Sequence, residues 1–298
     1  MNDYLIRGIA AEGTVRAFAI KSTELVAVAR ERHKTFPVVT AALGRLLSAG
    51  AMMGSMMKGD DDLVSLSIKG DGPIQSIMVT ADSHGNVKGF PGNPSVDIPP
   101  KRPGKLDVGG AVGEGTLTVV MDLGLAEPYN GTVELQNGEI AEDLAYYFAS
   151  SEQTPSAVGL GVMVDTNSEV KHAGGWIIQM MPNASEETTS KLESKLASIE
   201  PVTTLMDKGM SPEDILGYIL EDLDFEITDK TDVRFHCNCS KERVSKALAT
   251  IKSEEIQDII DEGKDIDVKC YFCNTMYSFT PAELEEILGE RNDKENQK

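Results

Sequence analysis

Cys237-Asn238-Cys239 and Cys270-Tyr271-Phe272-Cys273 are separated by 30 residues and contain all four cysteines of the 298-residue chain. Thiols gathered in two close pairs are typical of metal binding or redox chemistry, and four thiolates suit tetrahedral zinc. The CxxC half has a common zinc-binding spacing, whereas the CxC half and the 30-residue gap are unusual for a zinc ribbon. The sequence therefore predicts a small C-terminal unit that binds one Zn²⁺ ion.

The spacing of the cysteines leaves three interpretations open. A purely structural zinc would stabilise a unit whose own core is too small to give a stable fold without the metal. A redox switch would use the same site, because zinc holds sulfur as thiolate, and oxidation of thiolates to disulfides removes the metal's ligands. A thioredoxin-like dithiol fits less well, because a redox CxxC normally opens a helix, and residues 274–279 have the pattern of a strand. His236 is a further candidate ligand beside Cys237, although four sulfurs already complete a tetrahedral shell.

The residues around the cysteines predict a compact α+β unit at 232–290, followed by a polar tail at 291–298. Thr280-Pro281-Ala282-Glu283 has the spacing of a helix-capping box with proline at the first helical position. In chain order the pattern predicts strand Val233–His236, helices Ser240–Thr250 and Glu254–Glu262, strands Ile266–Lys269 and Thr275–Phe279, and helix Thr280–Leu288.

Residues 183–231 are acidic and carry a helical pattern with a thin apolar face. Ser211-Pro212-Glu213-Asp214 predicts a helix start, and Pro201 and Gly209 divide the segment into short helices. Short helices are marginal alone and need a surface to pack against. We therefore predict a metastable helical linker that depends on docking.

Residues 1–182 predict an N-terminal mixed domain of sheets and helices. A hairpin, three helices and several short strands separated by turns favour an α+β fold over a doubly wound parallel sheet. Residues 92–110 and the glycine-rich stretch 108–115 read as loop, since no phosphate-binding motif is present. Met52, Met53, Met56 and Met57 form a stripe on the second helix that suits either core packing or adaptable client contact. The elements expected are hairpin Tyr4–Ala10 and Thr14–Ile20; helices Thr23–Lys34, Pro37–Lys58 and Ile140–Ser151; and strands Leu63–Lys69, Ile74–Ala81, Val87–Phe90, Thr116–Met121, Thr132–Leu135, Val158–Val164 and Gly174–Met181.

Charge and composition exclude several classes of function. The chain has 28 basic and 48 acidic residues and a net charge of −20, which argues against binding to nucleic acid or an anionic membrane. It has no run of 18 apolar residues and no signal-like start, so we expect a cytoplasmic protein without a membrane span. No Ser/His/Asp or paired-carboxylate spacing is evident, so we expect no catalytic site and no enzyme.

The residues around the cysteines resemble the redox-regulated 33 kDa chaperonin family of heat-shock proteins. The similarity covers Phe235–Arg243 and Val268–Phe279, with Asn274 where glycine is expected after the CxxC. It continues upstream, in the expected order, at 70–74, 126–129, 147–148, 151–155, 173–175 and 179–182.

The resemblance implies an ATP-independent holdase that is inactive while zinc is bound to Cys237, Cys239, Cys270 and Cys273. It implies that oxidation forms the disulfides Cys237–Cys239 and Cys270–Cys273, releases zinc and unfolds the linker. The protein is then expected to form a homodimer through its N-terminal domain and to bind unfolding client proteins, preventing their aggregation.

Two rival functions follow from the cysteines alone. One is a structural zinc ribbon that binds nucleic acid or another partner, although 232–290 holds 7 basic and 13 acidic residues, an unfavourable balance for nucleic acid. The other is a thiol-disulfide oxidoreductase, which would reduce insulin.

Overall fold

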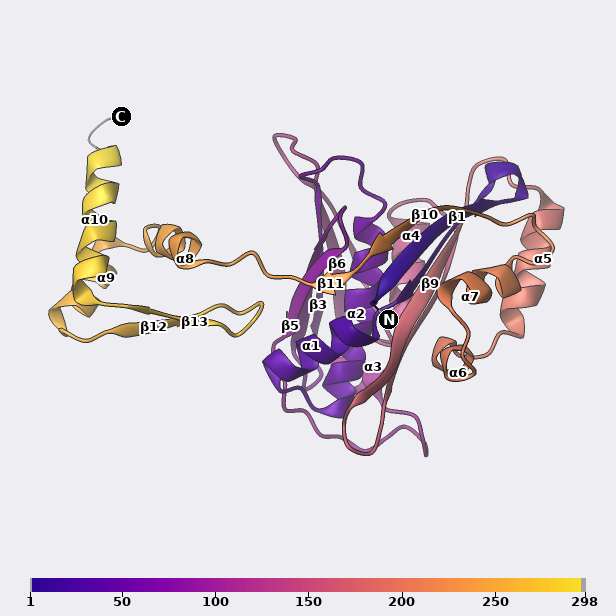
Figure 1. Cartoon of the computed structure of the whole chain (residues 1–298), viewed down its shortest axis with the longest axis horizontal. Coiled ribbons are helices and arrows are strands. Elements are labelled where there is room, and N and C mark those ends of the chain that lie inside the picture. Colours follow the sequence, from indigo (N-terminus) through magenta and orange to yellow (C-terminus); the bar gives the residue numbers. More distant parts are fainter. Residues whose placement is uncertain (1, 296–298) are drawn as a thin grey trace. The chain divides into compact units, whose positions relative to one another are not determined.

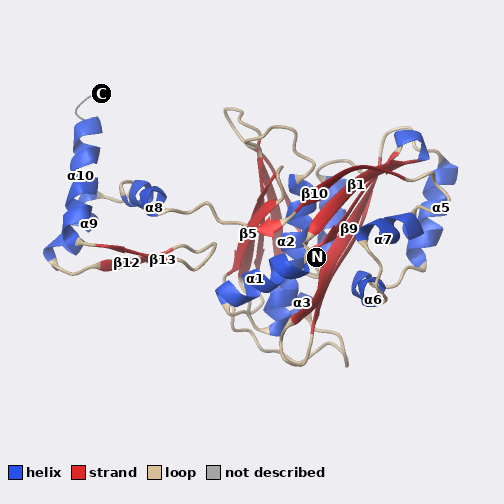
Figure 2. Cartoon of the chain, viewed as in Figure 1, coloured by secondary structure: helices blue, strands red, loops and turns tan. Residues whose placement is uncertain are grey.

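The computed structural model describes residues 2–295, which form two compact units that divide between His236 and Cys237. Both units combine helices with strands (Figure 1, Figure 2), which confirms the predicted α+β class. The finer boundaries 1–182, 183–231 and 232–290 stay a prediction.

The first unit contains a five-stranded antiparallel sheet, sheet A. The N-terminal hairpin is confirmed, and a 3₁₀ turn at Ala11–Gly13 joins its strands. Strand β8 lies at one edge of the sheet and β10 at the other. The spatial order is β10 (Glu226–Asp232), β1 (Tyr4–Ala10), β2 (Val15–Lys21), β9 (Val170–Met180) and β8 (Ser156–Val164).

A six-stranded sheet, sheet B, completes the strands of this unit. Its pairs are antiparallel except for β11, which lies parallel to β5. The order is β11 (Arg234–Phe235), β5 (Asn86–Pro91), β4 (Ser76–Asp82), β3 (Leu63–Gly70), β6 (Gly115–Asp122) and β7 (Tyr129–Glu134).

The apolar helix α2 (Pro37–Gly54) forms the centre of the main core. It contacts strands of both sheets and packs beside α1 (Thr23–His33), α3 (Val108–Val112) and β8. By length and composition α2 could cross a membrane, but 89% of its 18-residue window is buried within the protein, as in a core helix of a soluble fold. Met52 and Met53 are buried in this core, which supports the packing interpretation of the methionine stripe.

Helix α3 corrects the expectation that residues 92–110 and 108–115 are loop throughout. The carboxylate of Asp107 accepts a hydrogen bond from Gly110 N and caps this short helix. The glycines hid the helix from the sequence pattern, because glycine is a poor helix former.

Side chains alternate along sheet A and therefore enter two different cores. In β1, Leu5 joins the α2 core, whereas Ile6 joins a second cluster on the other face of the sheet. In β2, Phe18 likewise joins the α2 core, and Ala19 joins the second cluster. Both faces of sheet A are thus apolar, and other elements must pack on each face to exclude water.

Helices from residues 183–231, the predicted linker, pack on the second face. Helices α5 (Glu186–Ala197), α6 (Val202–Asp207) and α7 (Pro212–Ile219) lie on the side of β9 away from α2 (Figure 1). Their apolar residues pack with the outward-facing side chains of sheet A. The predicted short helices are therefore confirmed, and sheet A is the surface on which they dock. The buried side chains from this segment are Leu192, Val202, Leu205, Met206, Ile215, Leu216, Ile219, Leu220 and Leu223.

The end of this segment differs from the sequence expectation. Residues 226–232 form β10, which pairs with β1 instead of continuing the helices. The strand was missed because its side chains are polar and mostly exposed, so no alternating apolar pattern marks it. Ion pairs help to hold it, with Asp229 3.1 Å from Arg7 and Lys230 2.9 Å from Glu213.

The second unit is small, and its apolar core contains few fully buried side chains. It consists of helices α8 (Lys241–Leu248) and α9 (Ser253–Asp261), the hairpin β12 (Ile266–Lys269) and β13 (Met276–Phe279), and helix α10 (Pro281–Glu295). Helix α10 extends to Glu295, beyond the predicted helix end at Leu288, and residues 296–298 of the predicted polar tail lie outside the described residues. The predicted strand 233–236 belongs to the first unit, since β11 pairs with β5. The buried residues of the core are Leu248, Ile256, Ile260, Phe279 and Leu284.

A buried carboxylate near the N-terminus gives the first unit a pH-dependent stability. Asp3 is 2% exposed; its Oδ2 accepts a hydrogen bond from Leu25 N at 2.8 Å, while no partner of Oδ1 is present among the described residues. Burial raises the pKa of Asp3 from 3.8 to about 6. Because the folded protein then holds a proton that the unfolded chain releases, this group costs stability as pH rises from about 4 through 6.

The substitution Asp3→Asn keeps an acceptor for Leu25 N and removes the charge. Between pH 5 and pH 7.5, the wild type is expected to lose about 1 kcal/mol more unfolding free energy than the variant. Urea unfolding monitored by Trp176 fluorescence at both pH values measures the difference. Parallel pH profiles for the two proteins would show that Asp3 is not the titrating group.

Candidate metal centre

The β12–β13 hairpin presents the second cysteine pair in its turn. Strand pairing extends to Lys269 opposite Met276, and Cys270 N donates to Thr275 O at 2.9 Å. The turn closes where Asn274 N donates to Cys270 O at 2.8 Å. Asn274 has φ 58°, a left-handed conformation in which glycine is easiest and asparagine is the best tolerated alternative. Asparagine therefore meets the backbone requirement at the position where the sequence resemblance expected glycine.

The first cysteine pair lies in extended chain just before α8. Ser240 caps this helix, since its side chain accepts a hydrogen bond from Arg243 N. Arg243 Nη1 in turn donates to Asn238 O at 3.1 Å, across the CxC segment. The cap and this bond fix the chain on both sides of Cys239.

The four thiols converge on one point. All four Sγ atoms lie within 4.8 Å of one another, with 3.8 Å between Cys237 and Cys270 and 3.3 Å between Cys239 and Cys273. Zinc–sulfur bonds of about 2.3 Å in a tetrahedron place sulfurs about 3.8 Å apart. Cys273 is buried and the other three cysteines are half-buried. The arrangement thus needs only small shifts to become a tetrahedral thiolate site.

Two hydroxyl groups contact the sulfurs and were not singled out from the sequence. Tyr277 Oη donates to Cys239 Sγ at 3.1 Å, and Thr275 Oγ1 lies 3.2 Å from Cys273 Sγ. The available signal was their position directly after the CxxC, with Thr275 just before β13 and Tyr277 within it. Such contacts orient metal ligands and stabilise negative sulfur.

The thiols differ in acidity. Burial raises the pKa of Cys237, and burial also raises that of Cys270. Burial alone would raise the pKa of Cys273, but hydrogen bonds with Thr275 and with neighbouring thiols outweigh it and lower the pKa to about 7. The hydrogen bond to Cys239 raises the pKa of Tyr277 to about 12. Cys273 therefore ionises more readily than Cys237 or Cys270.

The other residues that the sequence analysis associated with the site have different partners. The cluster of possible ligands consists of the four cysteines and does not include His236, whose backbone N donates to Val87 O in β5. Lys241 forms an ion pair with Glu283, and Arg243 contacts the Asn238 carbonyl as described above. The donor set is therefore four sulfurs, which suits zinc or an iron–sulfur centre.

Comparison with known proteins decides the family. The sequence profile described as "Hsp33 protein" matches residues 3–280. The chain belongs to the Hsp33 family. The match includes both cysteine pairs and both sheets of the first unit, so the Hsp33 resemblance inferred from short motifs is confirmed.

Hsp33 relatives align along nearly the whole chain. The 33 kDa chaperonin of Agathobacter rectalis is 58% identical over 287 residues, 96% of this chain and 100% of that protein. The 33 kDa chaperonin of Lachnoclostridium phytofermentans is 53% identical, covering 98% of this chain and 100% of that protein. The crystal structure of the 33 kDa chaperonin (Hsp33) from Thermotoga maritima has a TM-score of 0.91 at 35% identity, covering 98% of this chain and 100% of that one. Membership of a family of chaperonins supports a chaperone function, and not an enzymatic one.

Proposed function

We propose that this protein is a redox-controlled, ATP-independent holdase whose four cysteines bind one Zn²⁺ in the inactive state. The observation that carries the proposal is the convergence of four sulfurs within 4.8 Å in a member of the Hsp33 family. Bound zinc would hold the four sulfurs as thiolates and stabilise the second unit. The residues proposed as ligands are Cys237, Cys239, Cys270 and Cys273.

Oxidation would convert this site into two disulfides. We propose Cys237–Cys239 and Cys270–Cys273 as the pairs. Each hydrogen peroxide accepts two electrons from one pair of thiols, so that one S–S bond forms and the peroxide becomes two waters. After two such steps no thiolate remains to hold the metal, and the second unit loses the folding free energy that metal binding supplied.

The surface that would capture clients lies beneath α5, α6 and α7. Its outward-facing side chains on sheet A form a continuous apolar cluster with the linker helices, so release of these helices would expose it. Exposed apolar patches of this kind bind other unfolded chains. After β10, a strand with little apolar burial of its own, only Val233, the two-residue strand β11 and His236 precede the cysteine unit, and we propose that unfolding of that unit is transmitted to β10 through this short connection.

The remaining parts of the proposal concern partners and location. The activated form would bind unfolding proteins and form a homodimer through its first unit, in the cytoplasm. The net charge of −20 supports the expectation that nucleic acid and anionic membranes are not its partners.

A peroxide titration of the reduced, zinc-loaded protein tests the switch. We expect one zinc per chain to appear on a chelating dye as four thiols disappear. Mass spectrometry of trapped peptides is expected to show links within each pair. Links Cys237–Cys270 and Cys239–Cys273, which join the sulfurs with the short contacts described above, would contradict the proposed pairing. Retention of zinc after all four thiols had reacted would contradict the switch.

Tyr277 is expected to strengthen metal binding through its hydrogen bond to Cys239. In the variant Tyr277→Phe the affinity for zinc should fall about tenfold or more, since loss of a group that supports a ligand typically costs 10–100-fold. Competition with a chelator measures the change. Tyr271→Phe is the matched control, because Tyr271 lies between Cys270 and Cys273 in the adjoining turn and is 74% exposed. Equal affinities for wild type and Tyr277→Phe would show that the hydroxyl does not support the site.

A structural zinc without redox control is the alternative that the geometry also allows. It predicts that chaperone activity, if present, is the same before and after oxidation. A dithiol oxidoreductase predicts that the metal-free, reduced protein reduces insulin, which we do not expect.

A further inference from the structure

A groove of about 550 Å³ runs along β8, the edge strand of sheet A. All residues from 158 to 164 line it, together with Ala41 and Arg45 of α2, residues 102 and 104–106, the start of α4 (Ala141–Ser150) and residues 199–204. Its size is within the range of about 300–1,000 Å³ that is usual for binding pockets. Of the nine residues of β8 only Gly161 is fully buried, so the strand remains accessible from the groove.

On the groove side, alternate backbone groups of β8 have no backbone hydrogen-bond partner among the described residues. Met180 N donates to Pro155 O, and Pro155 directly precedes β8. In the antiparallel register this bond makes the odd-numbered residues of β8 the ones that hydrogen-bond to β9. Because hydrogen bonding alternates along an antiparallel strand, the N–H and C=O groups of Val158, Leu160 and Val162 point away from β9. No backbone partner for these groups is found among the described residues. A free edge of this kind can accept another strand.

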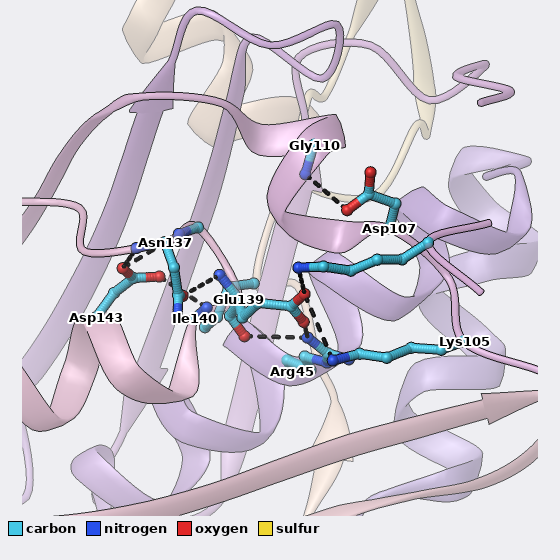
Figure 3. A network of polar contacts seen from close by, with 10 residues as sticks. Arg45, Lys105, Asp107, Gly110, Asn137, Glu139, Ile140 and Asp143 are labelled. Carbon is cyan, nitrogen blue, oxygen red and sulfur yellow. Dashed lines mark hydrogen bonds and ion pairs between the residues drawn. The ribbon is translucent and has the colours of Figure 1, made fainter. Parts of the chain in front are cut away.

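Positive charge surrounds one carboxylate at the wall of the groove (Figure 3). Arg45 and Lys105 point toward Glu139, whose oxygens lie 2.8 Å from Arg45 Nη1, 3.4 Å from Lys101 Nζ and 3.8 Å from Lys105 Nζ. Arg102 is a third cation of the lining, after Arg45 and Lys105, and Lys101 lies beside the groove. One carboxylate thus faces several cations, in a chain that is strongly acidic as a whole.

The loop that carries Glu139 is held rigidly. The fully buried carboxylate of Asp143 accepts hydrogen bonds from the backbone N of Gln136, Asn137, Gly138 and Ile140, at 2.7 to 3.3 Å. The other acidic residues at the groove are Glu142, which is exposed, and Glu200, which is paired with Lys208. The carboxylate of Glu139 is therefore fixed in place. With Lys101 counted beside the groove, four cations (Arg45, Lys101, Arg102 and Lys105) face three carboxylates (Glu139, Glu142 and Glu200).

We propose that this groove binds an extended aliphatic segment of an unfolded client protein as an added strand beside β8, with an acidic side chain of that segment against the basic residues 101–105. The proposal depends on the proposed chaperone function for the identity of the ligand. Main-chain hydrogen bonds to Val158, Leu160 and Val162 would provide affinity for any sequence, and the cations would select acidic segments.

A labelled seven-residue peptide of alternating valine and threonine with a terminal glutamate tests the groove by fluorescence anisotropy. The protein is the reduced, zinc-loaded full chain. Replacing the glutamate by lysine should weaken binding about fivefold, and Lys105→Glu should weaken binding of the glutamate peptide by a similar factor. Lys58→Glu is the matched control, since Lys58 is exposed and does not line the groove.

Backbone pairing is tested with N-methylated peptides whose side chains are unchanged. Methylating one alternate set of amides should weaken binding about tenfold or more, whereas methylating the other set, which faces away from β8, should have little effect. Equal binding of both methylated peptides would overturn strand addition. Failure of the parent peptide to bind, or a change in oligomeric state in Lys105→Glu, would assign this edge to another occupant such as a second copy.

Failures of the two proposals can be told apart. The peptide assay uses the reduced protein, in which the proposed holdase is inactive. A negative result would therefore contradict peptide binding in the groove without contradicting redox-controlled chaperone activity. If the peptide binds but the oxidised protein does not suppress client aggregation, only the proposed chaperone function is contradicted.

Discussion

Replacing Cys273 with serine is expected to abolish zinc binding and to unfold the second unit at 25 °C. Cys273 is the buried member of the four-sulfur cluster, and a serine hydroxyl is a poor zinc ligand. A structural zinc site contributes on the order of 10 kcal/mol to folding. The apolar core of the unit has few fully buried side chains and does not replace that contribution. Zinc content per chain should therefore fall from about one to near zero.

Amide exchange followed by mass spectrometry measures where the structure is lost in Cys273→Ser. Protection should disappear in α8, α9 and the β12–β13 hairpin, while α2 and both sheets keep theirs because they have a separate core. Asn274→Gly is the matched control, since glycine accepts the φ of 58° at that position and should retain zinc. A Cys273→Ser protein that keeps zinc and protection would contradict the account of the metal centre.

Placing a charge beneath α7 is expected to activate the chaperone without oxidation. Leu216 is fully buried in the cluster between the linker helices and sheet A. In Leu216→Asp an unpaired carboxylate would occupy this site, which costs about 3–5 kcal/mol. Helices this short have little stability of their own, so α5, α6 and α7 should detach. The reduced, zinc-loaded variant should then suppress aggregation of a heat-unfolding client.

Gly217→Asp is the matched control for this prediction. It adds the same charge to the neighbouring position of the same helix, where a Cβ would meet nothing within 4 Å. This variant should stay inactive until it is oxidised. If Leu216→Asp exposed the linker to amide exchange but stayed inactive, the outer face of sheet A would not be the client-binding surface.

The cysteine centre could be predicted from the sequence because its chemistry is local. The cysteines of the two pairs are two and three positions apart, so two short segments specify the four-sulfur cluster, and the capping box at Thr280 marks an adjoining helix. The hairpin at the N-terminus and helix α2 were also predictable, since their apolar patterns are strong. The contacts of Tyr277 and Thr275 with the sulfurs depend on β13 pairing with β12, which the cysteine spacing does not encode.

Other features depend on distant partners and could not be obtained in this way. β10 is polar, and its strand conformation comes from pairing with β1, more than 200 residues earlier in the chain. The sequence indicated that the short helices α5, α6 and α7 must pack against some surface, but it did not identify that surface. The surface is the second face of sheet A, to which Ile6 points while the neighbouring Leu5 points into the α2 core. The free edge of β8 is likewise a property of the strand order and not of its sequence.

Light scattering from a heat-unfolding client protein tests the central claim most directly. The client is heated alone, with the reduced zinc-loaded protein, and with the peroxide-oxidised protein. The account predicts that only the oxidised form suppresses scattering. Equal suppression by both forms would leave a chaperone without redox control, and suppression by neither would contradict the holdase function and return the cysteines to a structural role.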